Sequence, residues 1–274
     1  VKVVETGRQP GTYVALSHCW GTQQIITTRT ENIEDHKKAI DFQQLSKTFQ
    51  DAVTVTRKLG QRFLWIDSLC IIQNSAEDWA KESSYMGDIY LTATFTISAA
   101  GAVAGAIGCF MPRTPPLMDP ITIQYLSSNL QLESIHIGLP RGSLHSGLDD
   151  GPLQSRAWCL QERVLSRRNI HFCQNHIVWE CQMTSIAENG EHLDGASGME
   201  AYQLKLQDKI GTSSHLKDPL QSRFRKIVQD YTHRGLTKPF DKFPAISGLA
   251  QKIHQETGDK YVAGLWYNHL HNDL

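Results

Sequence analysis

The feature that most constrains the fold is an alternation of strand-like and helix-like segments over the first hundred residues. Three short apolar segments that contain β-branched or aromatic residues are typical of buried strands: residues 13–17, 63–66 and 94–98. Residues 48–59, and a segment beginning near Asn74 or Ser75, carry apolar side chains at helical spacing. This order predicts a parallel α/β sheet with right-handed crossovers and helices on both faces.

Local signals support these elements and weaken after residue 100. Ser46 or Thr48 is expected to cap the first helix, and Gly60 to end it. The later chain is expected to hold one or two strands over 121–139, helices over 156–165, 224–231 and 246–253, and a hairpin over 170–181 that turns at Gln174-Asn175.

Charge and cysteine content exclude several classes of protein. The 274 residues carry a formal net charge of −1, so nothing in the total predicts a nucleic-acid or membrane partner. No apolar run approaches the roughly 20 residues that span a bilayer. The six cysteines form no CxxC pair, and most sit in apolar runs, so reduced thiols and a cytoplasmic location are expected.

Polar and aromatic residues follow the ends of the predicted strands. Ser17, His18 and Trp20 come at the end of the first strand, and Asp67 with Ser68 at the end of the second. Parallel strands bring their carboxyl ends to one edge of the sheet, where open α/β sheets bind ligands. These side chains are therefore expected to converge, and nearby helix N-termini would favour phosphate groups.

The same residues also have structural interpretations. His18 would then be a core or capping histidine, and Trp20 would close the top of the core. Asp67 would cap the turn that follows it.

The helix over 156–165 offers two further candidates. Arg156 is either a solvated charge or an anion contact. Glu162 lies in an otherwise apolar helix, where it either belongs to a site or pairs with Arg163 or Arg167. The rival carboxylate, Glu82, is interpreted as part of a solvated helix face.

Other chemistries lack support in the sequence. The cluster His171, Cys173, His176 and Cys181 suggests zinc, but no CxxC or HxxxH pattern accompanies it, and no metal is expected. No G-x-S-x-G, P-loop or Rossmann glycine pattern is present.

Several long blocks resemble the fungal HET (heterokaryon incompatibility) domain family. They are YVALSHCWG (13–21), FLWIDSLCIIQN (63–74), DWAKESSYMGDIY (78–90), PLQSRAWCLQERVLS (152–166) and YVAGLW (261–266). HET domains are in turn similar to TIR domains, a flavodoxin-like α/β family with NAD-cleaving members. In those enzymes a W-C-x-x-E pattern carries the catalytic glutamate, and Trp158, Cys159 and Glu162 match it here.

The resemblance implies a fold and a division of the chain. A TIR-like core of a single HET-like domain would cover roughly 11–105 and 152–170, with an insertion over 106–151 and an α+β extension over 171–274. It implies Glu162 as the catalytic residue. The expected binding residues are those at the strand exits and on the helix over 156–165: Ser17, His18, Trp20, Asp67, Ser68, Arg156 and Trp158.

The implied function is NAD cleavage at the nicotinamide–ribose bond, in fungal self/non-self recognition and cell death. NAD would be substrate rather than cofactor, and no separate cofactor is expected. The alternatives are a non-catalytic, self-assembling signalling module and a biosynthetic enzyme that reuses the scaffold. A homo-oligomer and partner domains in a longer native chain are also expected.

Overall fold

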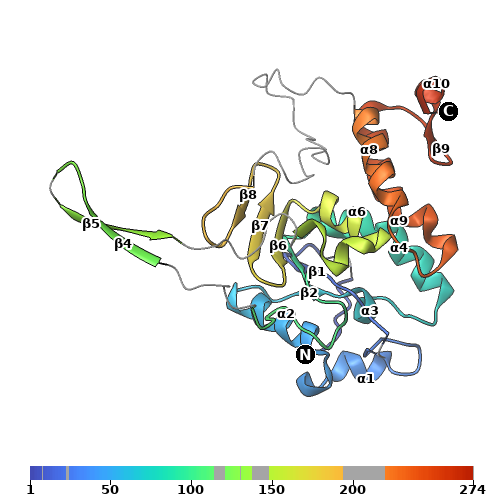
Figure 1. Cartoon of the computed structure of the whole chain (residues 1–274). Helices are drawn as coiled ribbons and strands as arrows, with labels where there is room; N and C mark the ends of the chain where they lie inside the picture. The colour runs from blue at the N-terminus through green and yellow to red at the C-terminus, as the bar shows by residue number, and fades with distance from the viewer. Residues whose placement is uncertain are drawn as a thin grey trace.

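The first three strands form the centre of one parallel sheet, as predicted. The structure is a computed structural model, and it describes residues 1–7, 9–22, 25–113, 121–129, 131–137, 148–193 and 220–273. Strand β1 (Val14–Ser17) lies between β2 (Leu64–Trp65) and β3 (Phe95–Ser98) and is parallel to both (Figure 1).

The sheet continues beyond β3 and changes direction. Its strand order is β2-β1-β3-β6-β7-β8. Strand β6 (Arg168–Phe172) is parallel to β3, whereas β7 (Ile177–Cys181) and β8 (Ser185–Ala187) are antiparallel additions. The chain passes from β1 to β2 on one side and then to β3 on the other. The strand order therefore reverses beside β1, and such a switch point is where open α/β sheets bind ligands.

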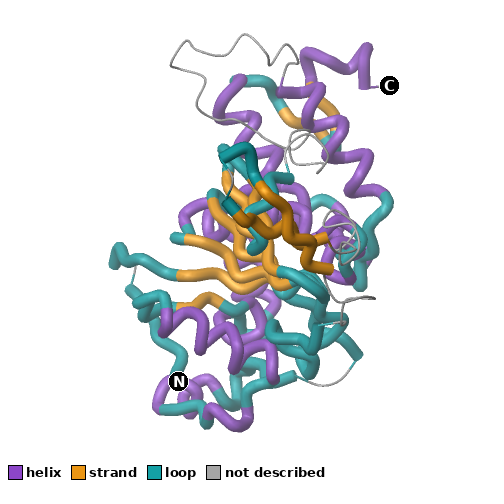
Figure 2. The backbone as a smooth tube through the Cα atoms, turned by 60° about the vertical axis from the view of Figure 1, so that its left-hand side comes forward, coloured by secondary structure: helices purple, strands orange, loops and turns teal. Residues whose placement is uncertain are grey.

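Helices cover both faces of the sheet. Successive side chains of a strand point to opposite faces, so each strand contributes to two cores. Val14 and Leu16 of β1 pack in one core with α2 (Lys47–Lys58). Ala15 points the other way and packs in a second core with α4 (Ala76–Thr92) and α6 (Ala157–Leu165). Figure 2 shows the strands enclosed between these helical layers.

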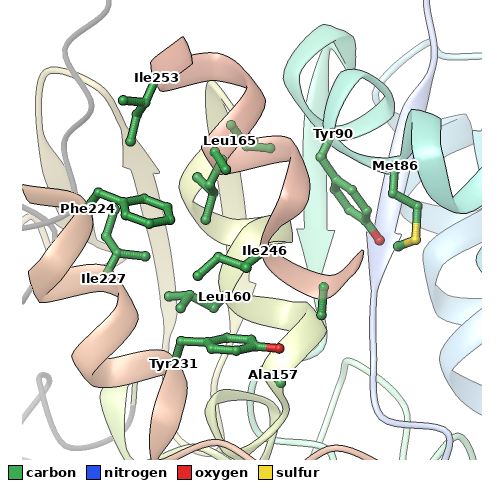
Figure 3. Close-up of a cluster of buried hydrophobic side chains, with 14 of the residues drawn as sticks. Met86, Tyr90, Ala157, Leu160, Leu165, Phe224, Ile227, Tyr231, Ile246 and Ile253 are labelled. Carbon is green, nitrogen blue, oxygen red and sulfur yellow. The ribbon is translucent and has the colours of Figure 1, made fainter. Parts of the chain in front are cut away.

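The second core extends far along the chain. Helix α9 (Pro244–Thr257) packs against α4 and α6, and α8 (Leu220–Thr232) packs against α6 and α9. Phe224, Ile227 and Ile246 meet Leu160 of α6 in a buried apolar cluster (Figure 3).

Helices α4 and α9 approach each other through two glycines, and this contact predicts a steric effect. A Cβ on Gly248 would lie 2.8 Å from Gly87 Cα and 2.9 Å from Gln161 Oε1. Gly248→Ala should therefore lower the free energy of unfolding by about 1–3 kcal/mol, despite the better helix propensity of alanine. Urea denaturation measures this. Gly11→Ala, where a Cβ meets nothing within 4 Å, is the control; equal effects of the two changes would contradict the tight contact.

The remaining elements are short. One hairpin separate from the sheet pairs β4 (Ile121–Leu126) with β5 (Leu132–Ile137). The others are α1 (Ile33–Lys38), η1 (Phe42–Gln44), α3 (Asp67–Cys70), η2 (Pro152–Ser155), η3 (Pro239–Lys242), β9 (Tyr261–Val262), β10 (Leu265–Trp266), η4 (Tyr267–His269) and α10 (Leu270–Asp273).

The structure agrees with several local predictions from the sequence. Ser46 caps α2, Ser75 caps α4, and residues 121–139 do contain two strands. All six cysteines are free. No helix in the described ranges is long and apolar enough to cross a membrane. The predicted insertion, 106–151, includes residues 114–120 and 138–147, which lie outside the described ranges.

Candidate active site

The residues that follow β1 and β2 meet, as the sequence predicts. Trp20 Nε1 donates a hydrogen bond to Asp67 Oδ2 at 2.9 Å. The other carboxylate oxygen, Oδ1, accepts from the Ser68 backbone N–H at 2.7 Å and lies 3.9 Å from His18 Nδ1. Asp67 does more than cap a turn, because its carboxylate joins the two strand exits.

Glu162 of α6 lies beside the same strand exit and is 5% exposed. The hydroxyls of Ser17 and Tyr90 hydrogen-bond its carboxyl group. The pKa of Glu162 is raised to about 7. Burial is the main cause and the negative charge of Asp67 adds to it, while the Ser17 hydrogen bond, Arg156 and Tyr90 oppose the shift. At neutral pH the carboxyl group is therefore divided between its protonated and ionised forms.

Tyr90 couples Glu162 to the backbone of β1. Its hydroxyl donates to the Leu16 carbonyl oxygen at 3.0 Å and also contacts the Glu162 carboxyl. A phenol has one proton to donate. Donation to Leu16 suits a protonated Glu162, whereas an ionised Glu162 competes for that proton.

Arg156 and two thiols complete the surroundings. Arg156 precedes α6, and the charges of Glu162, Asp67 and the neighbouring thiols act on it. Its Nε atom is buried without a hydrogen-bond partner among the described residues. Cys19 and Cys159 pack together, and burial raises the pKa of both thiols. Arg156 is thus no fully solvated surface charge, and the thiols are poor nucleophiles.

His18 is buried and carries an unused nitrogen. Its ring meets Phe49 edge to face at 5.0 Å. Burial lowers the pKa of His18, and nearby Arg156 adds to this effect, although Asp67 opposes it. The neutral ring places Nδ1 toward Asp67, while Nε2 has no hydrogen-bond partner in the described part of the chain. A proton on Nδ1 leaves Nε2 as an acceptor for a ligand hydroxyl.

One predicted binding residue lies apart from this group. Trp158 Nε1 donates to Asp241 Oδ2 at 3.1 Å, and its ring packs on the core around α9. The rival Glu82 pairs with Lys81 at 3.0 Å on α4. The sequence interpretation passed over Tyr90, whose place on the apolar face of a predicted helix gave no sign of its hydroxyl contacts.

Arg163, the neighbour of Glu162, belongs to a separate buried network. Its guanidinium makes two hydrogen bonds to Glu180, at 2.8 and 2.9 Å, and one to Asp149 at 3.0 Å. His171 Nε2 lies 2.8 Å from Glu180 Oε2. The structural alternative for Glu162, pairing with Arg163, is therefore wrong. Within the described residues, no three His, Cys, Asp or Glu side chains are placed to hold a metal ion.

Comparison with known protein families gives a match over the first part of the chain. The sequence from residue 13 to residue 162, more than half of the chain, matches the family described as heterokaryon incompatibility protein (HET). No curated protein and no solved structure matches the chain. The matched segment begins at β1 and ends at Glu162, and so includes every residue of the group around Asp67 and Glu162. The chain belongs to the heterokaryon incompatibility (HET) protein family.

Proposed function

We propose that this HET protein cleaves NAD at the nicotinamide–ribose bond, and that this activity serves self/non-self recognition and cell death. The observation that carries the proposal is Glu162, a buried carboxyl group with a pKa of about 7 at the switch point of the sheet. Perturbed carboxyl groups in such positions are typical of catalytic sites. Structural ion pairs also perturb pKa values, but Glu162 forms no ion pair with any residue that the structure describes.

The reaction needs a negatively charged group close to the reacting carbon. The bond from ribose C1′ to the pyridinium nitrogen breaks, and its electron pair leaves with neutral nicotinamide. The ribose becomes oxocarbenium-like, and an ionised Glu162 stabilises that charge. Water then attacks C1′ and releases a proton, which gives ADP-ribose. Asp67, with 24% of its side chain exposed, is the carboxylate placed to accept that proton.

The charge of the substrate would also set the state of Glu162. A cation near a carboxyl group favours the ionised form and lowers its pKa. The pyridinium ring of bound NAD therefore shifts Glu162 toward the form that the reaction requires. The partly exposed indole of Trp20, held by Asp67, offers an aromatic face for that ring.

Two groups suit the rest of the substrate. Arg156 precedes the N-terminus of α6, and a guanidinium combined with a helix N-terminus favours a diphosphate. The free Nε2 of His18 suits a ribose hydroxyl.

The direct test is incubation of the purified protein with NAD and chromatographic detection of nicotinamide and ADP-ribose in equal amounts. Release of both products supports the proposal. If neither product forms at any protein concentration tested, the protein is not an NAD nucleosidase by itself.

The pH dependence of this reaction supplies a sharper prediction. Because the ionised carboxylate is the active form, kcat/KM should rise with pH and reach half its maximum near pH 7. Tyr90→Phe removes a hydrogen bond that lowers the pKa of Glu162, so the midpoint should move to higher pH. Tyr13→Phe is the matched control, since its hydroxyl binds the Ile89 carbonyl oxygen instead. A profile that falls with pH, or equal shifts in both variants, would contradict this role.

The second candidate, a non-catalytic self-assembling module, is favoured by a different observation. Strands β4 and β5 carry a set of exposed apolar side chains that the site does not use. Self-association without release of nicotinamide would favour this candidate.

A further inference from the structure

The hairpin of β4 and β5 extends from the body of the protein (Figure 1). Every residue of β4 is exposed, and Leu132, Ile135 and Ile137 of β5 are also exposed. A two-stranded hairpin with no packing partner is at best marginally stable in water.

The pairing register makes this hairpin two-faced. Ile121 pairs with Ile137 and Ile123 with Ile135, so four isoleucines share one face. They are 47–57% exposed. Tyr125 and Glu133 follow on the same face and are joined by a 2.6 Å hydrogen bond. The opposite face carries the polar residues Thr122, Gln124 and Ser134, with a pair of leucines at the turn.

We propose that the isoleucine face of this hairpin is a self-association surface, on which the same face of a second copy packs. The four isoleucines and Tyr125 expose roughly 500 Å² together, which is the size of the largest apolar patch on a typical monomer, and such a patch is often a binding surface. Two copies packed face to face would bury roughly 1,000 Å², near the lower limit for a specific interface. The expected dimer is therefore weak.

The shape and charge of the surface favour a second copy over other occupants. A face of paired isoleucines can pack on the same face of a second copy about a two-fold axis. With the hairpins antiparallel, the two Glu133 carboxylates would lie roughly 14 Å apart, whereas parallel packing would bring these like charges together. A lipid surface fits less well, because residues 121–137 hold no Lys or Arg and one acidic residue.

Sedimentation equilibrium of the full chain over a wide range of protein concentration tests the proposal. The wild-type mass should rise from monomer to dimer. Ile123→Thr with Ile135→Thr keeps strand propensity but removes apolar surface, and should weaken the dimer on the order of 100-fold. Gln124→Thr with Ser134→Thr, on the polar face, is the matched control and should leave the dimer unchanged. Amide hydrogen exchange in β4 and β5 should slow as the wild-type concentration rises.

The outcomes separate the alternatives and do not depend on NAD cleavage. A monomer at all concentrations would overturn the proposal, and so would a dimer that both variant pairs leave intact. Binding of a monomeric wild type to phosphatidylcholine vesicles would identify a membrane as the occupant instead. Nicotinamide release by the non-associating variant would leave the proposed activity standing, whatever the result for the hairpin.

Discussion

Glu162→Gln is expected to lower the rate of NAD cleavage on the order of 100-fold or more, with the protein still folded. Glutamine keeps the size of the side chain and its ability to bond the Ser17 and Tyr90 hydroxyls, but it cannot carry the negative charge. The rate is measured as nicotinamide released per enzyme at saturating NAD. Glu82→Gln, a similar change at a partly buried position of α4 that pairs with Lys81, is the control and should retain nearly full activity.

The same substitution should increase stability at alkaline pH. The pKa of Glu162 is about 7 in the native state and 4.5 when exposed, so the native state binds more protons between these values. The free energy of unfolding therefore falls as pH rises through this window. Glu162→Gln should be more stable than wild type at pH 8, by roughly 1–3 kcal/mol, with no such gain at pH 4.

A loss of activity together with a gain in stability at pH 8 would identify Glu162 as a functional residue. A structural glutamate would behave in the opposite way, because its removal would unfold or weaken the protein. Cleavage of NAD by the folded variant at the wild-type rate would reject Glu162 as the catalytic carboxylate, and Asp67 would be tested next.

Arg163→Met is expected to have the largest effect on stability, lowering the free energy of unfolding by about 3–5 kcal/mol. The substitution leaves the buried carboxylate of Glu180 without the guanidinium that binds both of its oxygens. That guanidinium holds the pKa of Glu180 well below its usual range, with help from His171. The stabilisation is present above the ordinary glutamate pKa and is lost as pH falls below it.

Urea denaturation at neutral pH measures the loss. Arg113→Gln is the matched control, because Arg113 also binds both oxygens of a glutamate, Glu188, but at an exposed position. Arg113→Gln should lower the free energy of unfolding by less than about 1 kcal/mol. Arg163→Met combined with Glu180→Leu should recover part of the stability, since no buried carboxylate then remains unpaired. Equal losses of unfolding free energy in the Arg163 and Arg113 variants would show that burial does not increase the contribution of an Arg–Glu pair to stability.

The sequence predicts the centre of the fold because its signals are local. Residues 13–17, 63–66 and 94–98 are short and apolar, and the helices between them carry capping residues such as Ser46 and Ser75. Once these strands are parallel, geometry alone brings Ser17 and Asp67 to one edge. The predicted contact between the two strand exits follows from topology rather than from any single motif.

Partners that meet only in three dimensions could not be predicted in this way. Arg163 has Glu162 as its nearest acid in the sequence, yet it binds Glu180 of β7, a strand whose position depends on the whole sheet. Trp158 and Glu162 are four residues apart on α6, but the indole is bonded to Asp241 near α9. The hydroxyl of Tyr90 reaches Glu162 only because α4 and α6 pack side by side.

The segment that matches the HET family ends at residue 162, but the fold around it needs residues that come later in the chain. A chain ended at residue 162 would stop inside α6, three residues before that helix ends. It would lack β6, leaving an edge of β3 open, and it would lack α9, leaving Gly87 and the apolar face of α4 in water. Glu162 would then sit at a frayed terminus with a free α-carboxylate beside it, and its buried environment would be lost. The family match thus includes the residues around Glu162, whereas β6, α8 and α9, which complete the sheet and the core on α4 and α6, follow the matched segment.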